Sequence, residues 1–199
     1  PVRQKWFGVA CCPPNVGRTL ASLGQYIYAE DEYGVYINQF ISSTADTEVR
    51  ESRLKIKMNS TLLQDGKVQL QVQSSGPGIL NIRIPWYSEK WECVQNGISI
   101  EIQPEKGYQR LSISPGDTYI SLDFHVSPRW MGANNGVRAD AGKTALMKGP
   151  LVYCLEEKEN GRFLSEIFVE ENTSIEENAP AEELVGNVPT LSYKGKTEK

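Results

Sequence analysis

The chain has 199 residues, of which 39% are hydrophobic and 23% charged, and its formal net charge is −4. This length suits one large domain or two small ones. The acidic balance argues against a nucleic-acid partner, which would require clustered Lys and Arg. No apolar run approaches the roughly 20 residues that a membrane-spanning helix needs, so no membrane partner is expected.

The first residue is Pro1 rather than methionine, which indicates a piece of a longer protein. A targeting segment would then lie elsewhere in that protein, so its absence here says nothing about the compartment. The cellular compartment therefore has to be inferred from the reaction that the protein carries out.

Two adjacent cysteines followed by two prolines, Cys11-Cys12-Pro13-Pro14, form the most informative motif. Neighbouring thiols can form a strained vicinal disulfide, act as a redox pair, pack as a buried pair, or offer two soft ligands to one metal ion. A structural zinc site is almost always four-coordinate, and the chain has no Cys-x-x-Cys motif and no His-rich segment to complete one. Spacing alone leaves these alternatives open.

A helix is predicted over about residues 13–29. Pro13 and Pro14 suit a first helical turn, where a missing N–H costs nothing. Apolar residues then recur with helical spacing at Val16, Leu20, Leu23 and Ile27. The rest of the sequence offers this apolar face no obvious partner, so we expect the helix to belong to a structure upstream.

After Gly34 the apolar period changes to two, which is typical of strands with one buried face. The alternation recurs in segments that begin at Val35, Leu54, Val68, Leu80, Ile98 and Ile120. Asn96-Gly97 predicts a tight hairpin turn, because both residues tolerate positive φ. Successive strands without intervening helices predict a mainly β fold, an antiparallel β-sandwich of jelly-roll or immunoglobulin-like type.

The later sequence is less regular. Residues 128–143 predict a long loop, and an apolar pair of segments, 144–147 and 150–155, follows it. Residues 171–185 are acidic and predict a solvated loop or short helix. Cys93 and Cys154 both lie in strand-like apolar patterns, so each is expected to be a small buried hydrophobe.

Other candidate residues have ordinary structural interpretations. His125, the single histidine, is expected at the surface rather than as a base or ligand. Arg138 and Asp140 are expected to pair and hold the long loop rather than contact a sugar. The aromatic residues that could stack on sugar rings are expected instead to pack in the core or between domains; they are Trp86, Tyr87, Trp91 and Trp130.

The stretch from Cys11 to Asn15, followed by Gly17-Arg18, resembles the signature of glycoside hydrolase family 127, typified by β-L-arabinofuranosidases. Residues 137–146 and 148–156 also look like this family, as does the strand pattern before them. The resemblance covers most of the chain, to about residue 156, and the Cys-Cys-Pro-Pro-Asn block is its most specific part.

The resemblance implies an (α/α)6 catalytic barrel followed by β-sandwich domains, in a retaining exo-glycosidase. It implies that Cys11 is the nucleophile and a zinc ligand, and that Cys12 is a second zinc ligand. A third cysteine ligand, a ligand glutamate and an acid/base glutamate would come from upstream barrel segments. On this interpretation residues 1–30 are the end of the barrel, with its last helix at about 13–29, and residues 31–199 are the β-sandwich region.

An incomplete site implies that this chain alone is inactive and holds zinc weakly or not at all. Its partners would be the upstream barrel of the same polypeptide and a carbohydrate substrate of plant-glycan type. A missing last strand would leave an unpaired edge, through which a homodimer could form. Zinc thiolate chemistry suits a reducing bacterial cytoplasm, whereas glycan-degrading enzymes are often exported to the periplasm or beyond, so both compartments stay open.

Two functions of other classes remain as alternatives. The chain could be a non-catalytic carbohydrate-binding module, or a structural β-sandwich module in which Cys11 and Cys12 form a vicinal disulfide.

Overall fold

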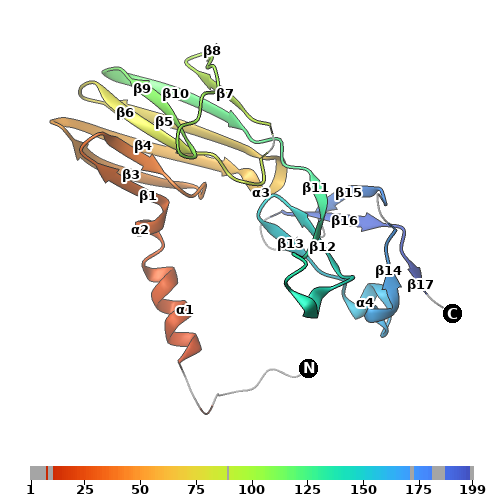
Figure 1. Cartoon of the computed structure of the whole chain (residues 1–199). Coiled ribbons are helices and arrows are strands. Elements are labelled where there is room, and N and C mark those ends of the chain that lie inside the picture. Colours follow the sequence, from red (N-terminus) through yellow and green to blue (C-terminus); the bar gives the residue numbers. More distant parts are fainter. Residues whose placement is uncertain (1–7, 9–10, 89, 171–172, 181–186, 198–199) are drawn as a thin grey trace. The chain divides into compact units, whose positions relative to one another are not determined.

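The computed structural model describes residues 8, 11–88, 90–170, 173–180 and 187–197 (Figure 1). The chain opens with α1 (Cys12–Ala21) and α2 (Gly24–Ile27), and continues into β1 (Tyr28–Asp31) and β2 (Gly34–Ile37). Strands dominate the remainder, so the predicted mainly β fold is confirmed. Among the helices described, none has the length and apolar character needed to span a membrane.

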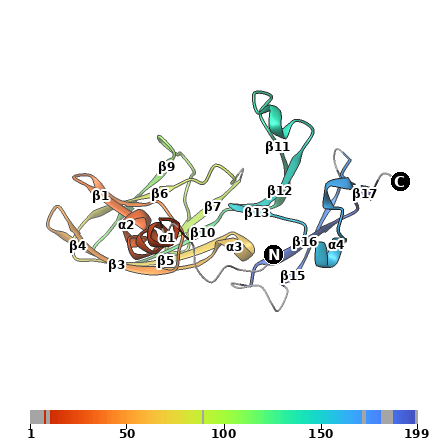
Figure 2. The same cartoon turned by 90° about the horizontal axis from the view of Figure 1, so that it is seen from below.

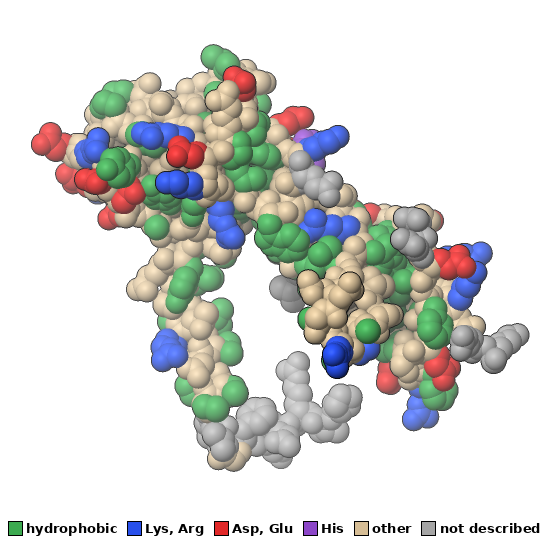
Figure 3. All heavy atoms as spheres, in the orientation of Figure 1, with side chains coloured by type: hydrophobic (Ala, Val, Ile, Leu, Met, Phe, Trp, Pro, Cys, Tyr) green, Lys and Arg blue, Asp and Glu red, His purple; other side chains and the backbone are tan. Residues whose placement is uncertain are grey.

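The predicted helix over 13–29 is two short helices in the structure. α1 ends at Ala21, where Ser22 bonds back to the carbonyls of Arg18 and Thr19, and Tyr28 already belongs to β1. No residue of α1 is buried in the described structure. Its apolar side chains are exposed along its surface (Figure 3), Val16 by 58% and Leu20 by 65%.

Two sheets form the layers of a β-sandwich (Figures 1 and 2). The first has the strand order β1-β2-β6-β9, in which β6 spans Gly78–Arg83 and β9 spans Tyr108–Ile113. The second has the order β3-β4-β5-β10-β7-β8. Its strands are β3 (Ser43–Val49), β4 (Ser52–Thr61), β5 (Lys67–Ser74), β7 (Glu92–Gln95), β8 (Ile98–Ser99) and β10 (Gly116–Asp123).

The predicted alternation of buried and exposed residues is confirmed along the longer strands. In β4, Leu54, Ile56 and Met58 are each 1% exposed, while Lys55 and Lys57 between them face water. β5 follows the same rule, with Val68, Leu70 and Val72 in the core. Each strand therefore contributes one apolar face to the sandwich core and one polar face to solvent.

One pair of neighbouring strands is parallel. β2 pairs with β6 with Val35 opposite Leu80, whereas β6 pairs with β9 in the antiparallel sense. Parallel neighbours need a long crossover connection, and here the connecting chain supplies β3, β4 and β5 to the other sheet. Apolar alternation does not report strand direction, so the sequence did not reveal this pair.

The strand predicted from Ile98 is largely wrong. Only Ile98 and Ser99 form β8, and Ile98 is 69% exposed. The turn before it is confirmed: Asn96 and Gly97 have φ values of 49° and 80°, and Val94 lies opposite Ser99. The hairpin forms without the long half-buried strand expected after it.

Two compact units make up the chain: Pro1–Ser60 with Gln69–Ile84 and Val94–Ile120, and Thr61–Val68 with Pro85–Cys93 and Ser121–Lys199. The second unit holds a sheet of order β11-β12-β13 and the two-stranded ribbons β14-β17 and β15-β16. Their bounds are β11 (Pro128–Gly132), β12 (Thr144–Lys148), β13 (Leu151–Tyr153), β14 (Ile167–Phe168), β15 (Ile175–Pro180), β16 (Pro189–Tyr193) and β17 (Lys196–Thr197). It also holds the short helices α3 (Leu62–Asp65), α4 (Glu157–Asn160), η1 (Arg138–Asp140) and η2 (Leu164–Glu166).

Two loop predictions are partly wrong in this unit. The first five residues of the expected loop 128–143 form β11, in which Trp130 lies opposite Leu146 of β12. Residues 175–180 of the expected acidic loop form β15, while 171–172 and 181–185 lie outside the described residues. The apolar pair predicted at 144–155 is confirmed as the β12–β13 hairpin.

Candidate functional site

The cysteine pair lies at the start of α1. Cys11 is the residue before the first helical turn, and Cys12 is the first residue of the helix. The two Sγ atoms are 3.7 Å apart, and both side chains are exposed. A disulfide requires about 2.0 Å between sulfurs, so both thiols are free in this structure.

The type and spacing of the two thiols suit one zinc ion. With Zn–S bonds of about 2.3 Å in a tetrahedral site, two sulfurs lie about 3.8 Å apart. The observed separation of 3.7 Å is close to that value. Within the described ranges, no three or more His, Cys, Asp and Glu side chains gather into a metal-binding group. The pair can therefore supply two ligands, and the others would have to come from elsewhere.

The other two cysteines differ from each other. Cys93 is 2% exposed, and burial raises the pKa of its thiol to about 11, so the prediction of a buried hydrophobe is confirmed. Cys154 is exposed, so the same prediction is wrong there. It lines a hollow of about 840 Å³ in the second unit, together with Tyr153 and Leu191.

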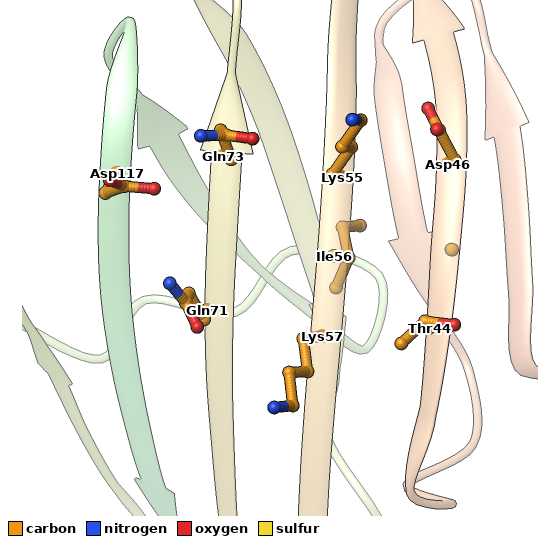
Figure 4. A pocket seen from close by; sticks show the side chains of 9 residues that line it. Thr44, Asp46, Lys55, Ile56, Lys57, Gln71, Gln73 and Asp117 are labelled. Carbon is orange, nitrogen blue, oxygen red and sulfur yellow. The ribbon is translucent and has the colours of Figure 1, made fainter.

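A second hollow, of about 510 Å³, lies on the six-stranded sheet (Figure 4). Polar side chains from β3, β4, β5 and β10 line it, including Asp46, Lys55, Lys57, Gln71, Gln73 and Asp117. Its charged side chains are two lysines and two aspartates, and one of these aspartates, Asp46, is already paired with Arg53. The sequence did not predict this group of polar residues, because they come together only through the order of the strands in the sheet. The one signal in the sequence was that each lies on the solvent-exposed face of its strand.

Arg53 controls the charge at one side of this hollow. Its Nε and Nη2 atoms donate to the two carboxylate oxygens of Asp46 at 2.7 and 2.8 Å. This bidentate hydrogen bonding holds the pKa of the Asp46 carboxyl below its usual value. Asp46 therefore stays ionised in mildly acidic solution.

The aromatic residues mainly pack, as predicted. The Trp91 ring stacks on Phe124 at 6.1 Å, and Trp130 meets the Tyr193 ring edge-on at 4.9 Å. Trp86 differs, because its side chain is 62% exposed and contacts the Tyr87 ring at 5.9 Å. No local pattern distinguishes Trp86 from the other tryptophans in the sequence.

His125 and the loop pair take ordinary surface positions. His125 is exposed, as predicted, with its ring nitrogens 3.4 Å from Glu92 and 3.7 Å from Asp123. Asp140 forms its ion pair with Lys143, at 3.7 Å, rather than with Arg138. The expected Arg138–Asp140 pair is therefore wrong.

Two family models match the chain. Residues 34–125 match the model described as beta-L-arabinofuranosidase, GH127 middle domain, and residues 128–196 match the glycoside hydrolase family 127 C-terminal domain. The chain belongs to glycoside hydrolase family 127. The resemblance seen in the sequence is thus confirmed. Cys11 and Cys12 lie before both matched ranges, so the roles assigned to them stay predictions.

A curated family 127 relative covers much of the chain. The non-reducing end beta-L-arabinofuranosidase of Bifidobacterium longum subsp. longum is 37% identical over 167 residues. The match covers 79% of this chain but 25% of the relative. The chain therefore spans about a quarter of that relative's length.

Solved family 127 structures have the same fold. The β-L-arabinofuranosidase Ara127N-Se from Geobacillus stearothermophilus T6 matches with a TM-score of 0.86 and 35% identity, over 98% of this chain and 31% of that one. A family 127 β-arabinofuranosidase matches with a TM-score of 0.89 and 25% identity, over 98% of this chain and 34% of that one. In each case this chain corresponds to about a third of a longer polypeptide.

Proposed function

We propose that this chain is the C-terminal β-sandwich portion of a retaining exo-glycoside hydrolase that releases terminal β-L-arabinofuranose, or a related sugar, from plant-type glycans. The 37% identity with a non-reducing end beta-L-arabinofuranosidase carries the proposal. The two free thiols 3.7 Å apart at the start of α1 support it.

In this proposal Cys11 is the nucleophile. Its thiolate sulfur forms a bond to the anomeric carbon while the glycosidic C–O bond breaks, and an upstream carboxylic acid protonates the leaving oxygen. The resulting carboxylate then takes a proton from water, whose oxygen displaces the sulfur, so the anomeric configuration is retained. Cys12 would bind zinc beside Cys11, and a bound zinc ion keeps coordinating thiols deprotonated at neutral pH.

The chain by itself supplies only part of this machinery. The acid/base glutamate, the third cysteine ligand and the ligand glutamate would belong to the upstream barrel of the same polypeptide. The exposed apolar side chains of α1, Val16 and Leu20, would pack on that barrel as its last helix. We therefore propose that the isolated chain is inactive and binds zinc weakly.

The test compares the isolated chain with the complete polypeptide. We expect the complete polypeptide to hydrolyse an aryl β-L-arabinofuranoside and to hold zinc by elemental analysis, and the isolated chain to do neither. Cys11→Ser and Cys12→Ser should abolish or strongly reduce both properties, while Cys154→Ser, which removes another exposed thiol, should leave them intact. Hydrolysis or stoichiometric zinc in the isolated chain would contradict the proposal.

A non-catalytic carbohydrate-binding module is the second candidate, and the polar hollow of Figure 4, which has two glutamine side chains in its lining, favours it. Calorimetric titration of the isolated chain with arabinan oligosaccharides tests it. Binding that Gln71→Ala and Gln73→Ala weaken would support this candidate, and no detectable heat would count against it. A homodimer through an exposed strand edge stays a prediction, which sedimentation of the complete polypeptide would check.

A further inference from the structure

Three side chains form a row across β2, β6 and β9 on the outer face of the first sheet. Tyr36 lies opposite Asn81 on β6, and Asn81 lies opposite Arg110 on β9. Leu80 and Ile82, on either side of Asn81, are 0% exposed in the core, so Asn81 points to the opposite face. Figure 2 shows β6 and β9 in one layer of the sandwich and β4 and β5 in the other. The row therefore lies on the side of the first sheet that faces away from the second.

The Asn81 amide has no hydrogen-bond partner within the part of the chain that the structure describes, although the residue is only 8% exposed. In that part, the unpartnered side-chain atoms that are fully enclosed belong to Arg129, so the amide of Asn81 reaches the surface. Buried polar residues are nearly always hydrogen-bonded. An amide that is held in place, accessible and unpartnered leaves two donors and an acceptor oxygen free for a ligand.

Two tyrosine rings beside this amide are fixed before any ligand arrives. The rings of Tyr36 and Tyr108 meet at 5.3 Å and 88°, so they form a corner. The Tyr36 hydroxyl donates to Oδ2 of Asp31 at 2.8 Å, and the Tyr108 hydroxyl donates to Oδ1 of Asn38 at 2.7 Å. Both rings are half-buried, so part of each stays accessible. Side chains that are already ordered lose little conformational entropy when a ligand binds.

Arg110 adds a free cation to the row. Its side chain is exposed, and its guanidinium has no acceptor among the described residues. The guanidinium keeps five N–H donors, which can bind a hydroxyl group singly or a carboxylate in pairs. An apolar ring, an amide and a guanidinium thus lie side by side on one surface of a single compact unit.

We propose that this surface binds a saccharide, through Tyr36, Asn81, Tyr108 and Arg110. A tyrosine ring stacks on the apolar C–H face of one sugar residue, the Asn81 amide binds its hydroxyl groups, and Arg110 binds a further hydroxyl or a carboxylate. A polyphosphate is a poorer match, because the Asp31 carboxylate lies beside Tyr36. The site does not depend on the proposed catalysis, since all four residues belong to this chain. The hollow of Figure 4 lies on the other sheet, so the two surfaces can be tested separately.

Stability measurements separate a binding role of Asn81 from a structural one. Because its amide has no partner in the fold, Asn81→Leu should leave the thermal unfolding midpoint unchanged or raise it. Gln109→Leu is the matched control: Gln109 is 5% exposed, and its Oε1 accepts a hydrogen bond from the Gln103 backbone N–H at 2.8 Å. That change should lower the midpoint by several degrees. An equal fall for Asn81→Leu would show that the amide supports the fold, and would overturn the site.

Binding is measured by NMR titration of the 199-residue chain with arabinotriose, a neutral probe, and with trigalacturonate, an acidic one. At least one probe should shift the backbone amide signals of β2, β6 and β9, and Asn81→Leu should weaken its affinity by about tenfold, as expected for one or two lost hydrogen bonds. A larger effect of Arg110→Gln on the acidic probe would assign Arg110 to a carboxylate, and equal effects would assign it to a hydroxyl.

Two results of this titration would overturn the site. One is the absence of shifts with both probes. The other is shifts confined to β4 and β5 that Gln71→Ala removes and Asn81→Leu does not, which would place binding in the hollow of Figure 4 instead. Neither result bears on hydrolysis by the complete polypeptide, so failure of this site and failure of the proposed activity are distinguishable.

Discussion

Lys148 of β12 and Glu177 of β15 form an ion pair within the second unit, with Nζ and Oε1 2.5 Å apart. The Lys148 side chain is 3% exposed, and its ammonium also donates to the backbone carbonyl of Gln64, at 2.7 Å. Glu177 is 40% exposed, so solvent reaches one side of the pair. A single buried charge thus links β12 to β15 and to α3.

Removing the carboxylate of this pair should destabilise the chain. Glu177→Leu leaves a buried ammonium whose remaining partner is a backbone carbonyl. We therefore expect the free energy of unfolding to fall by about 2–4 kcal/mol. This is less than the full cost of breaking a buried ion pair, because Glu177 is partly solvated. The double variant Lys148→Met with Glu177→Leu should lose less than Glu177→Leu alone. Urea unfolding measures both, and Lys143→Ala, which removes an exposed ion pair with Asp140, is the control. Equal losses for Glu177→Leu and Lys143→Ala would contradict the interpretation.

The four thiols should react at very different rates. Cys11, Cys12 and Cys154 are exposed, whereas burial raises the pKa of Cys93 to about 11, so little Cys93 thiolate exists at pH 8. Titration of the folded, reduced chain with a chromogenic disulfide should show three fast thiols, and a fourth only after unfolding. One fast thiol before reduction and three after it would indicate a vicinal Cys11–Cys12 disulfide instead.

Gly34 should tolerate no side chain. A Cβ atom there would lie 2.5 Å from the backbone carbonyl oxygen of Ile79, which the pairing of β2 with β6 holds in place. Gly34→Ala should therefore lower the free energy of unfolding by about 1–3 kcal/mol, as expected for overpacking. Gly17→Ala is the matched control: its Cβ would meet nothing within 4 Å, and alanine favours the helix, so the change should be neutral or slightly stabilising.

Trp130 joins β11 to the end of the chain in two separable ways. Its ring meets Tyr193 at 4.9 Å, and its Nε1–H donates to the Thr173 carbonyl at 3.0 Å. Trp130→Phe keeps the ring contact and should cost about 1 kcal/mol, whereas Trp130→Ala should cost about 2–4 kcal/mol because the side chain is half-buried. Chemical denaturation distinguishes the two, with the exposed Phe163→Ala as a control expected to change little.

The Asp46–Arg53 pair should make stability depend on acidity. Hydrogen bonding from Arg53 lowers the pKa of the Asp46 carboxyl in the folded state. The pair therefore stabilises the fold fully above the ordinary aspartate pKa of about 4. This stabilisation is lost as the pH falls through the lower folded-state pKa. Asp46→Asn should therefore be less stable than the parent chain at pH 7, and the two should converge once the pH lies below the lowered folded-state pKa of Asp46. A difference that persists at low pH would show that the carboxylate charge is not its cause.

Local sequence predicted the burial pattern of the long strands, but it did not predict every strand of the second unit. The alternation in β4 and β5 predicted which side chains are buried, since each strand has to place one face in the core. The sequence did not predict β11 and β15, because the contacts that stabilise them join residues far apart in the chain. Trp130 contacts Tyr193 and Thr173, and Lys148 pairs with Glu177. Cys154 was mispredicted for the same reason: its local apolar pattern does not show that its side chain faces a hollow.

Short motifs and the apolar alternation were enough to indicate family 127 and to predict the buried face of each long strand, because both are read from residues that lie close together in the chain. The order of the strands, with its parallel pair β2 and β6, and the polar groups that meet across neighbouring strands became known from the folded chain alone. The hollow around Asp46 arises from the order of these strands. Strand order depends on contacts between residues far apart in the chain, and a local period carries no information about them.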